Sequence, residues 1–214
     1  LSVDELLKRA DTAMYEAKRA GRDSVRFFDP AMQAELEGRI GLENDLRHAL
    51  KNRQFILHFQ AQVDDSYRII SAEVLLRWIH PEHGIAPPAQ FIPVAEETGL
   101  ILPIGQWVLE SACACLKAWA THPLARDLEL AVNVSARQFR QSGFVDQVRR
   151  VLEKTGAPPG KLKLELTESL VLDNVEDSIS KMEALRANGI RFSMDDFGTG
   201  HSSLTYLKRL PLSQ

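Results

Sequence analysis

The sequence predicts an α/β fold, either a barrel or an open doubly wound sheet, preceded by a separate helical segment. Two observations lead to this prediction. From residue 55 onward, apolar and polar residues alternate with the period of two that is typical of strands. In addition, strand-like segments begin at residues 128, 162 and 190, and a spacing of about 30 residues is typical of repeated βα units in a parallel sheet.

Residues 1–52 are expected to be separate from this sheet. Ser2 and Glu5 make a capping-box start, and apolar residues recur at helical spacing until Gly21, which predicts one amphipathic helix. Residues 25–28 are expected to form a short strand. Because one helix and one strand cannot bury their own apolar faces, we expect residues 1–30 to end a preceding domain and residues 31–52 to form a linker helix.

Residues 53–214 carry the pattern of the sheet domain. Five strands are expected, at 55–63, 70–78, 128–134, 162–167 and 190–196. Five helices are expected, at 89–98, 103–119, 144–155, 175–188 and a short one from Ser202. The first two strands are close in sequence, so they are most simply antiparallel neighbours.

The composition is that of a globular protein with a sizeable core. The 214 residues are 44% hydrophobic and 26% charged, and the formal net charge is −3. This balance argues against a DNA or RNA polymer as a partner, because neutralising phosphates needs a basic surface. The sequence has no apolar run of about 18 residues and no signal peptide at its start, so a cytoplasmic location is expected.

Two further features bear on organisation. Cys113 and Cys115 lie two residues apart in a helical pattern, so they point to different sides and are expected to be core residues rather than a disulfide or metal pair. The chain begins with Leu1 rather than Met, which indicates a segment of a longer protein.

Residues whose side-chain oxygen atoms could bind a metal ion, called oxygen donors below, recur near the ends of the expected strands. In each strand the apolar residues share one face, which leaves the oxygen donors on the other face. In chain order, these donors are Glu73, Asn133, Glu165 and Asp195. In a barrel they would converge at the C-terminal mouth, where such folds build active sites.

These donors suggest a metal site. Oxygen-only ligands suit Mg²⁺, Mn²⁺ or Ca²⁺ better than zinc. Asp195 is followed at once by Asp196, and two adjacent carboxylates suit a pair of metal ions, an arrangement that often serves phosphate-ester hydrolysis. Any one acidic residue at a strand end is more often a helix cap or a solvated residue, and a structural ion-pair network also remains an alternative.

Some polar residues near these motifs carry a simpler interpretation. His80 and His83 have no Cys or third His beside them in sequence, so a solvated loop is expected there. Glu96 and Glu97 are expected to be on the surface, and Glu168 is expected either to support the site or to cap the segment after its strand.

Five ordered motifs resemble those of the EAL-type phosphodiesterases, which cleave the bacterial second messenger cyclic di-GMP. They are EVLLRW at 73–78, FIP at 91–93 with AEETGLI at 95–101, VNVSARQ at 132–138, LELTES at 164–169 and DDFGTG at 195–200. At the N-terminus, ADTAMYEAK at 10–18 and GRD at 21–23 resemble the end of a GGDEF-type diguanylate cyclase domain, without its signature loop.

The EAL resemblance implies a modified TIM barrel with an antiparallel first strand and hydrolysis of cyclic di-GMP to linear pGpG. It implies that Glu73, Asp195 and Asp196 are catalytic. It also implies that the cofactor is Mg²⁺ or Mn²⁺, bound as two ions. The implied metal ligands are Glu73, Asn133, Glu165, Asp195 and Asp196. The implied nucleotide contacts are Gln60, Leu75 and Arg77, of which Arg77 would bind a phosphate.

The resemblance also implies partners outside the site. A loop of four residues is expected to couple the metal site to a homodimer interface, namely Phe197, Gly198, Thr199 and Gly200. Upstream GGDEF and sensor domains are expected in the full-length protein, which could be tethered to a membrane through them. The alternative function is a receptor of degenerate EAL type, which binds cyclic di-GMP without cleaving it.

The sequence departs from the family pattern at several places. Val74 replaces the Ala of the name-giving motif and is expected to point away from Glu73, while Ala61 and His201 replace the usual Pro and Tyr. The chain also stops before the strands that bring a catalytic Lys and a further metal-binding Glu in the family. A complete barrel of about 250 residues would need about 75 more than residues 40–214 supply, so the EAL domain is expected to be incomplete.

Overall fold

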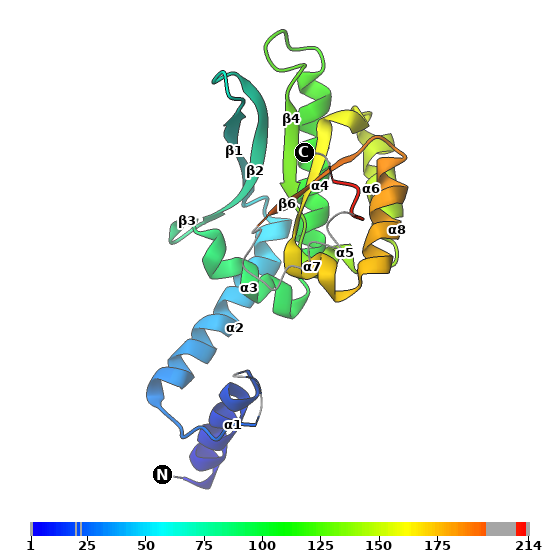
Figure 1. Ribbon diagram of the computed structural model, residues 1–214. Coiled ribbons are helices and arrows are strands. Elements are labelled where there is room, and N and C mark those ends of the chain that lie inside the picture. Colours follow the sequence, from blue (N-terminus) through cyan, green and yellow to red (C-terminus); the bar gives the residue numbers. More distant parts are fainter. Residues whose placement is uncertain (1, 20, 22, 196–208, 213–214) are drawn as a thin grey trace. The chain divides into compact units, whose positions relative to one another are not determined.

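The computed structural model describes the whole chain except residues 1, 20, 22, 196–208 and 213–214 (Figure 1). The chain divides into two compact units, residues 1–48 and residues 49–214. All six of the described strands belong to the second unit.

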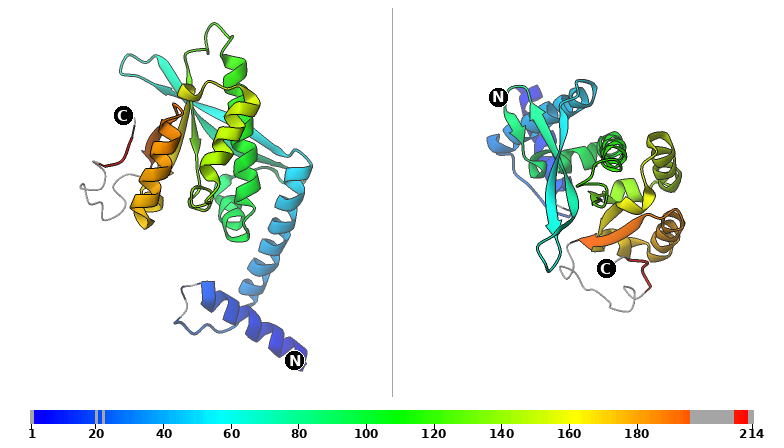
Figure 2. Two further views of the ribbon diagram at one scale, coloured as in Figure 1. Left: turned by 90° about the vertical axis from the view of Figure 1, so that its right-hand side faces the viewer. Right: turned by 90° about the horizontal axis from the view of Figure 1, so that it is seen from above.

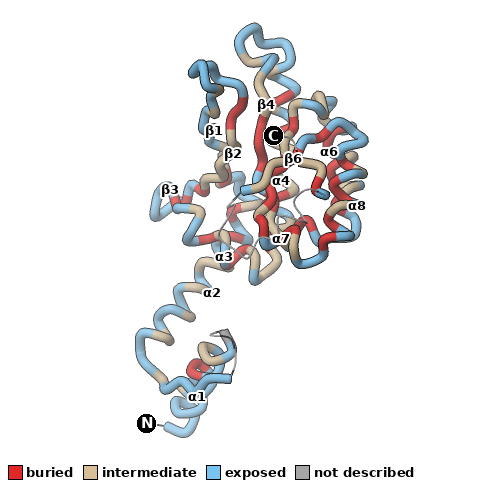
Figure 3. The backbone as a smooth tube through the Cα atoms, in the orientation of Figure 1, coloured by how far each residue is buried: buried red, intermediate tan, exposed pale blue. Residues whose placement is uncertain are grey.

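The first unit consists of two helices, α1 (Val3–Arg19) and most of α2 (Pro30–Lys51). They contact each other through Thr12, whose hydroxyl donates to Gln33 Oε1 at 2.8 Å, and through Lys8, which lies 3.6 Å from Glu37 Oε1. Most of α1 and α2 is exposed (Figure 3).

The expected strand at residues 25–28 is wrong. These residues are outside any strand, and the side chains of Val25 and Phe27 are 84% and 86% exposed. The physical reason is that a strand needs a partner for its backbone groups, and no described residue pairs with this segment.

The second unit is built on a six-stranded sheet in the order β1-β2-β4-β5-β6, with β3 paired to β2 outside this path. The strands are β1 (Phe55–Val63), β2 (Ile69–His80), β3 (Gly84–Ala86), β4 (Glu129–Asn133), β5 (Leu162–Thr167) and β6 (Arg191–Asp195). The expected antiparallel pairing of the first two strands is confirmed, and β2, β4, β5 and β6 are parallel to one another.

The short strand β3 was not expected from the sequence. It extends the β1–β2 hairpin by pairing Trp78 with Ala86 and Ile79 with Ile85. The turn before it is held by His80, whose Nδ1 accepts the backbone N–H groups of Glu82 and His83 at 3.2 and 3.3 Å. His80 is buried as the last residue of β2, which corrects the expectation of a solvated loop there, whereas His83 lies in an exposed turn as expected.

The longer helices lie along one face of this sheet (Figures 1 and 2). They are α3 (Pro88–Thr98), α4 (Ile101–Trp119), α6 (Phe144–Thr155) and α8 (Val175–Arg186). The alternate residues of the strands that face them are apolar and buried, including Leu130, Val132, Leu164 and Phe192. The alternation expected from the sequence therefore places the core between the sheet and these helices.

Three short elements follow the sheet strands or precede them: α5 (Ala136–Phe139), the 3₁₀ turn at Pro159–Lys161, and α7 (Glu168–Asp173). The sequence did not predict them as helices. The helix expected from Ser202 lies outside the described residues. In the part of the chain that the structure describes, no single helix is long and apolar enough to cross a membrane, and only the sharply bent pair α3 and α4 passes that test together.

Candidate functional site

The strand register brings the predicted oxygen donors to one face of the sheet, opposite the helices. Glu73 pairs with Ala131, two residues before Asn133, and Asn133 pairs with Glu165. Thr167 pairs with Asp195, which places Asp195 on the same side as Glu165 because side chains two residues apart share a face. Four donors from four strands therefore lie on one face near the C-terminal ends of β4, β5 and β6.

Direct hydrogen bonds join some of these side chains. Asn133 Nδ2 donates to Glu73 Oε1 at 2.8 Å, so the amide oxygen of Asn133 is left to face other partners. Ser193 Oγ donates to Glu165 Oε1 at 3.0 Å, and Lys163 Nζ lies 3.9 Å from the same oxygen. Side chains from neighbouring strands thus hold Glu73 and Glu165 in place.

The electrostatics of Glu165 are unusual for a carboxylate. Its side chain is nearly buried, and this burial raises its pKa above the ordinary value of 4.5. The hydrogen bond from Ser193 and the charge of Lys163 act in the opposite direction, while the negative charges of Glu73 and Asp195 raise the pKa further. Carboxylates that repel one another in a partly dry site would be stabilised by a cation.

The donor set fits a hard divalent cation. Three carboxylates and one amide supply only oxygen ligands on this face, as Mg²⁺ and Mn²⁺ prefer. Within residues 2–195, apart from the gaps at 20 and 22, no three His, Cys, Asp or Glu side chains are close enough together to hold an ion. Glu73 and Glu165 point instead to their hydrogen-bond donors, Asn133 and Ser193.

A cavity of about 290 Å³ adjoins these groups, between the second half of β2, the exit of β4 and the start of α4. Leu75 and Arg77, two of the predicted nucleotide contacts, line it together with Asn133 and Glu165. The third predicted contact, Gln60, is not among its lining residues but pairs with Glu73 in the β1–β2 register. The structure therefore places predicted binding residues beside the acidic donors.

The same cavity corrects one prediction. Glu96 was expected to be a surface residue, but it is half-buried and lines the cavity from the C-terminal turn of α3. The reason lies in the tertiary structure: the pairing of β2 with β4 ends at Val74, and residues of α3 and α4 line the cavity beyond that point. Its neighbour Glu97 is exposed, as expected.

Of the remaining predicted residues, the structure describes Val74 and Glu168. Val74 is buried on the helix-covered face, so it points away from Glu73 as the sequence indicated. Glu168, the first residue of α7, is buried directly after β5. Asp196 and the loop of Phe197, Gly198, Thr199 and Gly200 lie outside the described residues.

Sequence reasoning missed three residues near these groups: Lys163 and Ser193, which lie 3.9 and 3.0 Å from Glu165 Oε1, and Gln138, which lines the cavity. Lys163 and Ser193 share the phase of Glu165 and Asp195 within their strands, and that phase was their available signal. Gln138 closes a capping box with Ser135, a pattern visible in the sequence as a Ser followed three residues later by a Gln.

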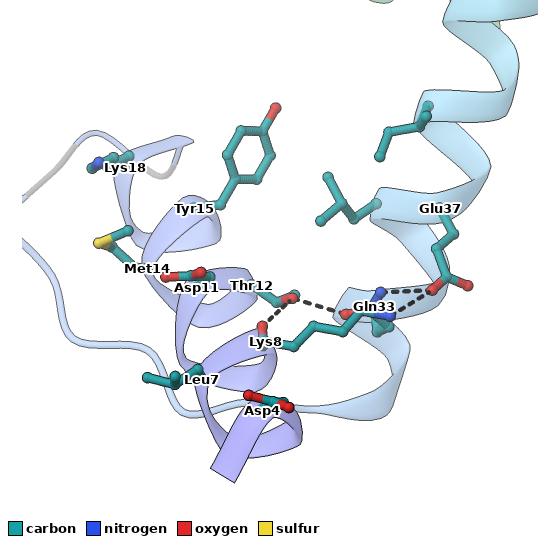
Figure 4. Close-up of a pocket in the computed structure, with 12 residues that line it drawn as sticks. Asp4, Leu7, Lys8, Asp11, Thr12, Met14, Tyr15, Lys18, Gln33 and Glu37 are labelled. Carbon is teal, nitrogen blue, oxygen red and sulfur yellow. Dashed lines mark hydrogen bonds and ion pairs between the residues drawn. The ribbon is translucent and has the colours of Figure 1, made fainter. Parts of the chain in front are cut away.

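A larger cavity, of about 730 Å³, lies between α1 and α2 in the first unit (Figure 4). Its lining includes exposed apolar side chains such as Leu7, Met14 and Ile40, and it holds none of the strand-end donors. The larger cavity is therefore not the candidate site. The smaller cavity is favoured because oxygen donors line it.

A mixed sheet covered by helices, with acidic and amide side chains near the C-terminal ends of its parallel strands, is typical of α/β domains that build their sites at the strand ends. Residues 43–214 match the EAL domain family. Because this match extends over most of the chain, the protein belongs to that family.

Individual relatives are also similar to the chain over nearly its whole length. The chain is 47% identical over 211 residues to the bifunctional diguanylate cyclase/cyclic di-GMP phosphodiesterase MucR of Pseudomonas aeruginosa, covering 98% of this chain and 31% of that protein. It is 39% identical over 212 residues to the cyclic di-GMP phosphodiesterase NbdA of the same species, covering 98% and 27%. The chain thus spans about a third or less of the length of these curated relatives.

A solved structure described as the PaMucR phosphodiesterase in complex with c-di-GMP has the same fold. It superposes with a TM-score of 0.77 at 47% identity, and the match covers 81% of this chain and 70% of that one.

Proposed function

We propose that this domain hydrolyses cyclic di-GMP to linear pGpG by metal-assisted attack of water on one phosphodiester. The observation that carries the proposal is the convergence of Glu73, Asn133 and Glu165 on one face of the sheet, beside a cavity lined by Leu75 and Arg77. The phosphodiesterase names of the relatives and the c-di-GMP complex of PaMucR support the same choice of substrate.

Each residue has a role in this proposal. Glu73, Asn133, Glu165 and Asp195 would hold one Mg²⁺ or Mn²⁺, and Asp195 and Asp196 would hold a second. When bound, the ions supply positive charge that polarises the phosphoryl oxygens and favours ionisation of the attacking water. Asn133 orients Glu73 through its amide, and Ser193 orients Glu165 through its hydroxyl.

The nucleotide would be bound by residues of β1 and β2. Arg77 would pair with a phosphate, a role that suits the planar guanidinium group. Leu75 offers apolar surface in the same cavity, and Gln60 would hydrogen-bond from the neighbouring strand.

We also propose the wider organisation that the sequence suggested. Residues 1–30 would end a GGDEF domain, residues 31–52 would form a linker helix and residues 53–214 would belong to an EAL domain whose full form is a closed barrel. The bifunctional name of MucR supports the tandem. Homodimerisation through the EAL domain, with the loop of residues 197–200 as the coupling element, and a cytoplasmic location stay predictions.

The test is to incubate the purified chain, and the natural protein with any further strands it contains, with cyclic di-GMP and Mg²⁺ or Mn²⁺. Formation of pGpG and binding of the nucleotide are measured in parallel, with EDTA as the control. We expect hydrolysis that EDTA abolishes. Binding without turnover in both forms would instead assign the protein to the receptor class, and neither binding nor turnover would remove cyclic di-GMP as the ligand.

A further inference from the structure

The short helix α5 begins directly after β4, where the chain leaves the sheet beyond Asn133. The backbone N–H of Val134 still donates to Glu165 O at 3.0 Å, which continues the parallel ladder by one bond beyond β4. Ser135 is already the N-cap of α5. Only these two residues separate Asn133, the last residue of β4, from the first residue of the helix.

Gln138 fixes the start of α5 through a reciprocal capping box. Its backbone N–H donates to Ser135 Oγ at 3.3 Å. Its side-chain Oε1 accepts from Ser135 Oγ at 2.9 Å and from the Ser135 backbone N–H at 3.3 Å. Gln138 is 4% exposed, and a buried amide keeps such a position only when its hydrogen bonds are satisfied.

The amide of Gln138 fits because α4 has a glycine opposite it. A Cβ at Gly105 would come within 1.8 Å of Gln138 Nε2 and 2.2 Å of its Cδ. Because the amide is held by its capping bonds, it has no free rotation with which to avoid such a contact. Gly105 and Gln138 therefore interlock α4 with the chain that follows β4.

Two cations hold α5 from other sides. Arg137 Nη1 donates to the carbonyl oxygens of Glu96 and Glu97, the latter at 3.1 Å, which ties α5 to the C-terminal end of α3. Lys181 Nζ, a buried group of α8, donates to Phe139 O at 2.9 Å. Together with the contact between Gln138 and Gly105, these bonds connect a helix of four residues to the three longer helices α3, α4 and α8. A helix this short depends on such tertiary contacts for its stability.

We propose that Gln138 is a positioning residue for Asn133. Through the capping box and its seat against Gly105, it fixes the turn after β4 so that Asn133 Nδ2 meets Glu73 Oε1. The inference rests on the proposed function, in which Asn133 and Glu73 hold the metal, and it deepens that function by naming what keeps these two ligands aligned. A residue that orients ligands in this way typically changes metal affinity by about 10–100-fold when it is replaced.

The experiment compares Gln138→Leu, which keeps the side-chain size but loses both polar atoms, with Gln138→Glu, which keeps the acceptor of the capping box. Gln141→Leu is the matched control, because Gln141 is exposed and lies outside the capping box, three residues after Gln138. Mn²⁺ binding to the full chain is titrated by electron paramagnetic resonance. We expect about a tenfold or greater loss of affinity in Gln138→Leu, recovery in Gln138→Glu and no change in Gln141→Leu.

A second readout is independent of the metal. The NMR signals of the Asn133 side-chain amide report its hydrogen bond to Glu73, and they are expected to shift in Gln138→Leu but not in Gln138→Glu or Gln141→Leu. If the unsubstituted chain binds no Mn²⁺, the metal part of the proposed function fails, and these signals still decide whether Gln138 positions Asn133.

Unchanged Asn133 signals together with unchanged Mn²⁺ affinity in Gln138→Leu would overturn the inference. If that variant does not fold, Ser135→Ala replaces it, because this change removes the hydroxyl of the same box at a smaller cost to stability. A displaced Asn133 signal in Ser135→Ala supports the positioning role, and a signal identical to that of the unsubstituted chain refutes it.

Discussion

The helix-covered face of the sheet and its polar face differ in what their side chains contact. On the helix-covered face, Leu130, Leu164 and Phe192 are completely buried among other apolar groups. On the polar face, one residue away along the same strands, Glu165 is nearly buried beside other carboxylates, and the burial raises its pKa. Adjacent residues of one strand thus differ in their effect: the side chains on one face supply stability, and the other face holds a carboxylate whose charged form is unfavourable where it is buried.

The largest expected effect tests whether the polar face carries the chemistry. Asp195→Asn removes one negative charge from the proposed metal ligands and keeps the size of the side chain, so hydrolysis of cyclic di-GMP should be abolished while the unfolding temperature changes little. The control is Asp146→Asn in α6, an exposed residue paired with Arg149. An unchanged rate in Asp195→Asn would contradict the site assignment.

The next effect belongs to the helix-covered face. Phe192→Ala removes a fully buried ring from β6 and should lower the free energy of unfolding by about 3–5 kcal/mol, because the surrounding helices cannot close the cavity completely. Urea denaturation measures the change. A loss below about 1 kcal/mol would mean that this face tolerates a cavity and that the contrast between the faces is weaker than the burial indicates.

Arg77→Ala tests the polar face for binding rather than for hydrolysis. If Arg77 makes a charge-assisted contact with a phosphate, its removal should weaken cyclic di-GMP binding by about 1.5–3 kcal/mol, measured by calorimetry. Arg126→Ala is the matched control, since Arg126 is exposed and paired only with the adjacent Asp127 among the described residues. Equal affinities for the two variants would remove Arg77 from the binding site.

Glu165→Gln tests how much the buried charge of Glu165 lowers the free energy of unfolding. The folded pKa of Glu165 is raised, so the folded state binds its proton more tightly than the unfolded state, and stability falls as the pH rises from about 4.5 through the folded pKa. In EDTA at pH 7 the variant should therefore be more stable than the original chain, and the difference should disappear at pH 4. A destabilised variant at pH 7 would show that Ser193 and Lys163 already compensate the charge.

Glu110 offers the opposite case and the smallest effect. It lies on the solvent side of α4, where hydrogen bonds from Gln106 and Lys154 lower its pKa. Its contribution to stability is present above pH 4.5 and is lost as the pH falls through the folded pKa. Because Glu110 is about a third exposed, Glu110→Gln should cost only about 0.2–1 kcal/mol at pH 7, and less in 1 M salt.

Regular elements with a clear period could be predicted well. The bounds of β5 (Leu162–Thr167) and α6 (Phe144–Thr155) agree with the sequence pattern residue for residue, because alternation and helical spacing depend only on local order. Residues 25–28 have an equally strand-like composition, but strand formation depends on a partner elsewhere in the chain. Local pattern alone could not reveal that no described strand pairs with them.

The same limit applies to the site. Phase predicted that Glu73, Asn133, Glu165 and Asp195 share a face, because phase is a property of each strand. The contacts between these strands depend on register, so the bond from Asn133 to Glu73 and the bond from Ser193 to Glu165 could not be derived before the structure. The seat of Gln138 against Gly105 depends on helix packing and was equally out of reach.

The place of β2 in the sheet has a consequence for the order in which the protein is made. Glu73 lies in the β1–β2 hairpin, which can form as soon as both strands have left the ribosome. Its partners arrive much later: Asn133 is 60 residues further along the chain, and Asp195 is about twice as far. At about 5–20 residues per second, the nascent chain spends several seconds with Glu73 in place and the proposed metal ligands incomplete. A chain whose synthesis is interrupted before β6 would therefore fold part of its sheet without ever assembling the four donors.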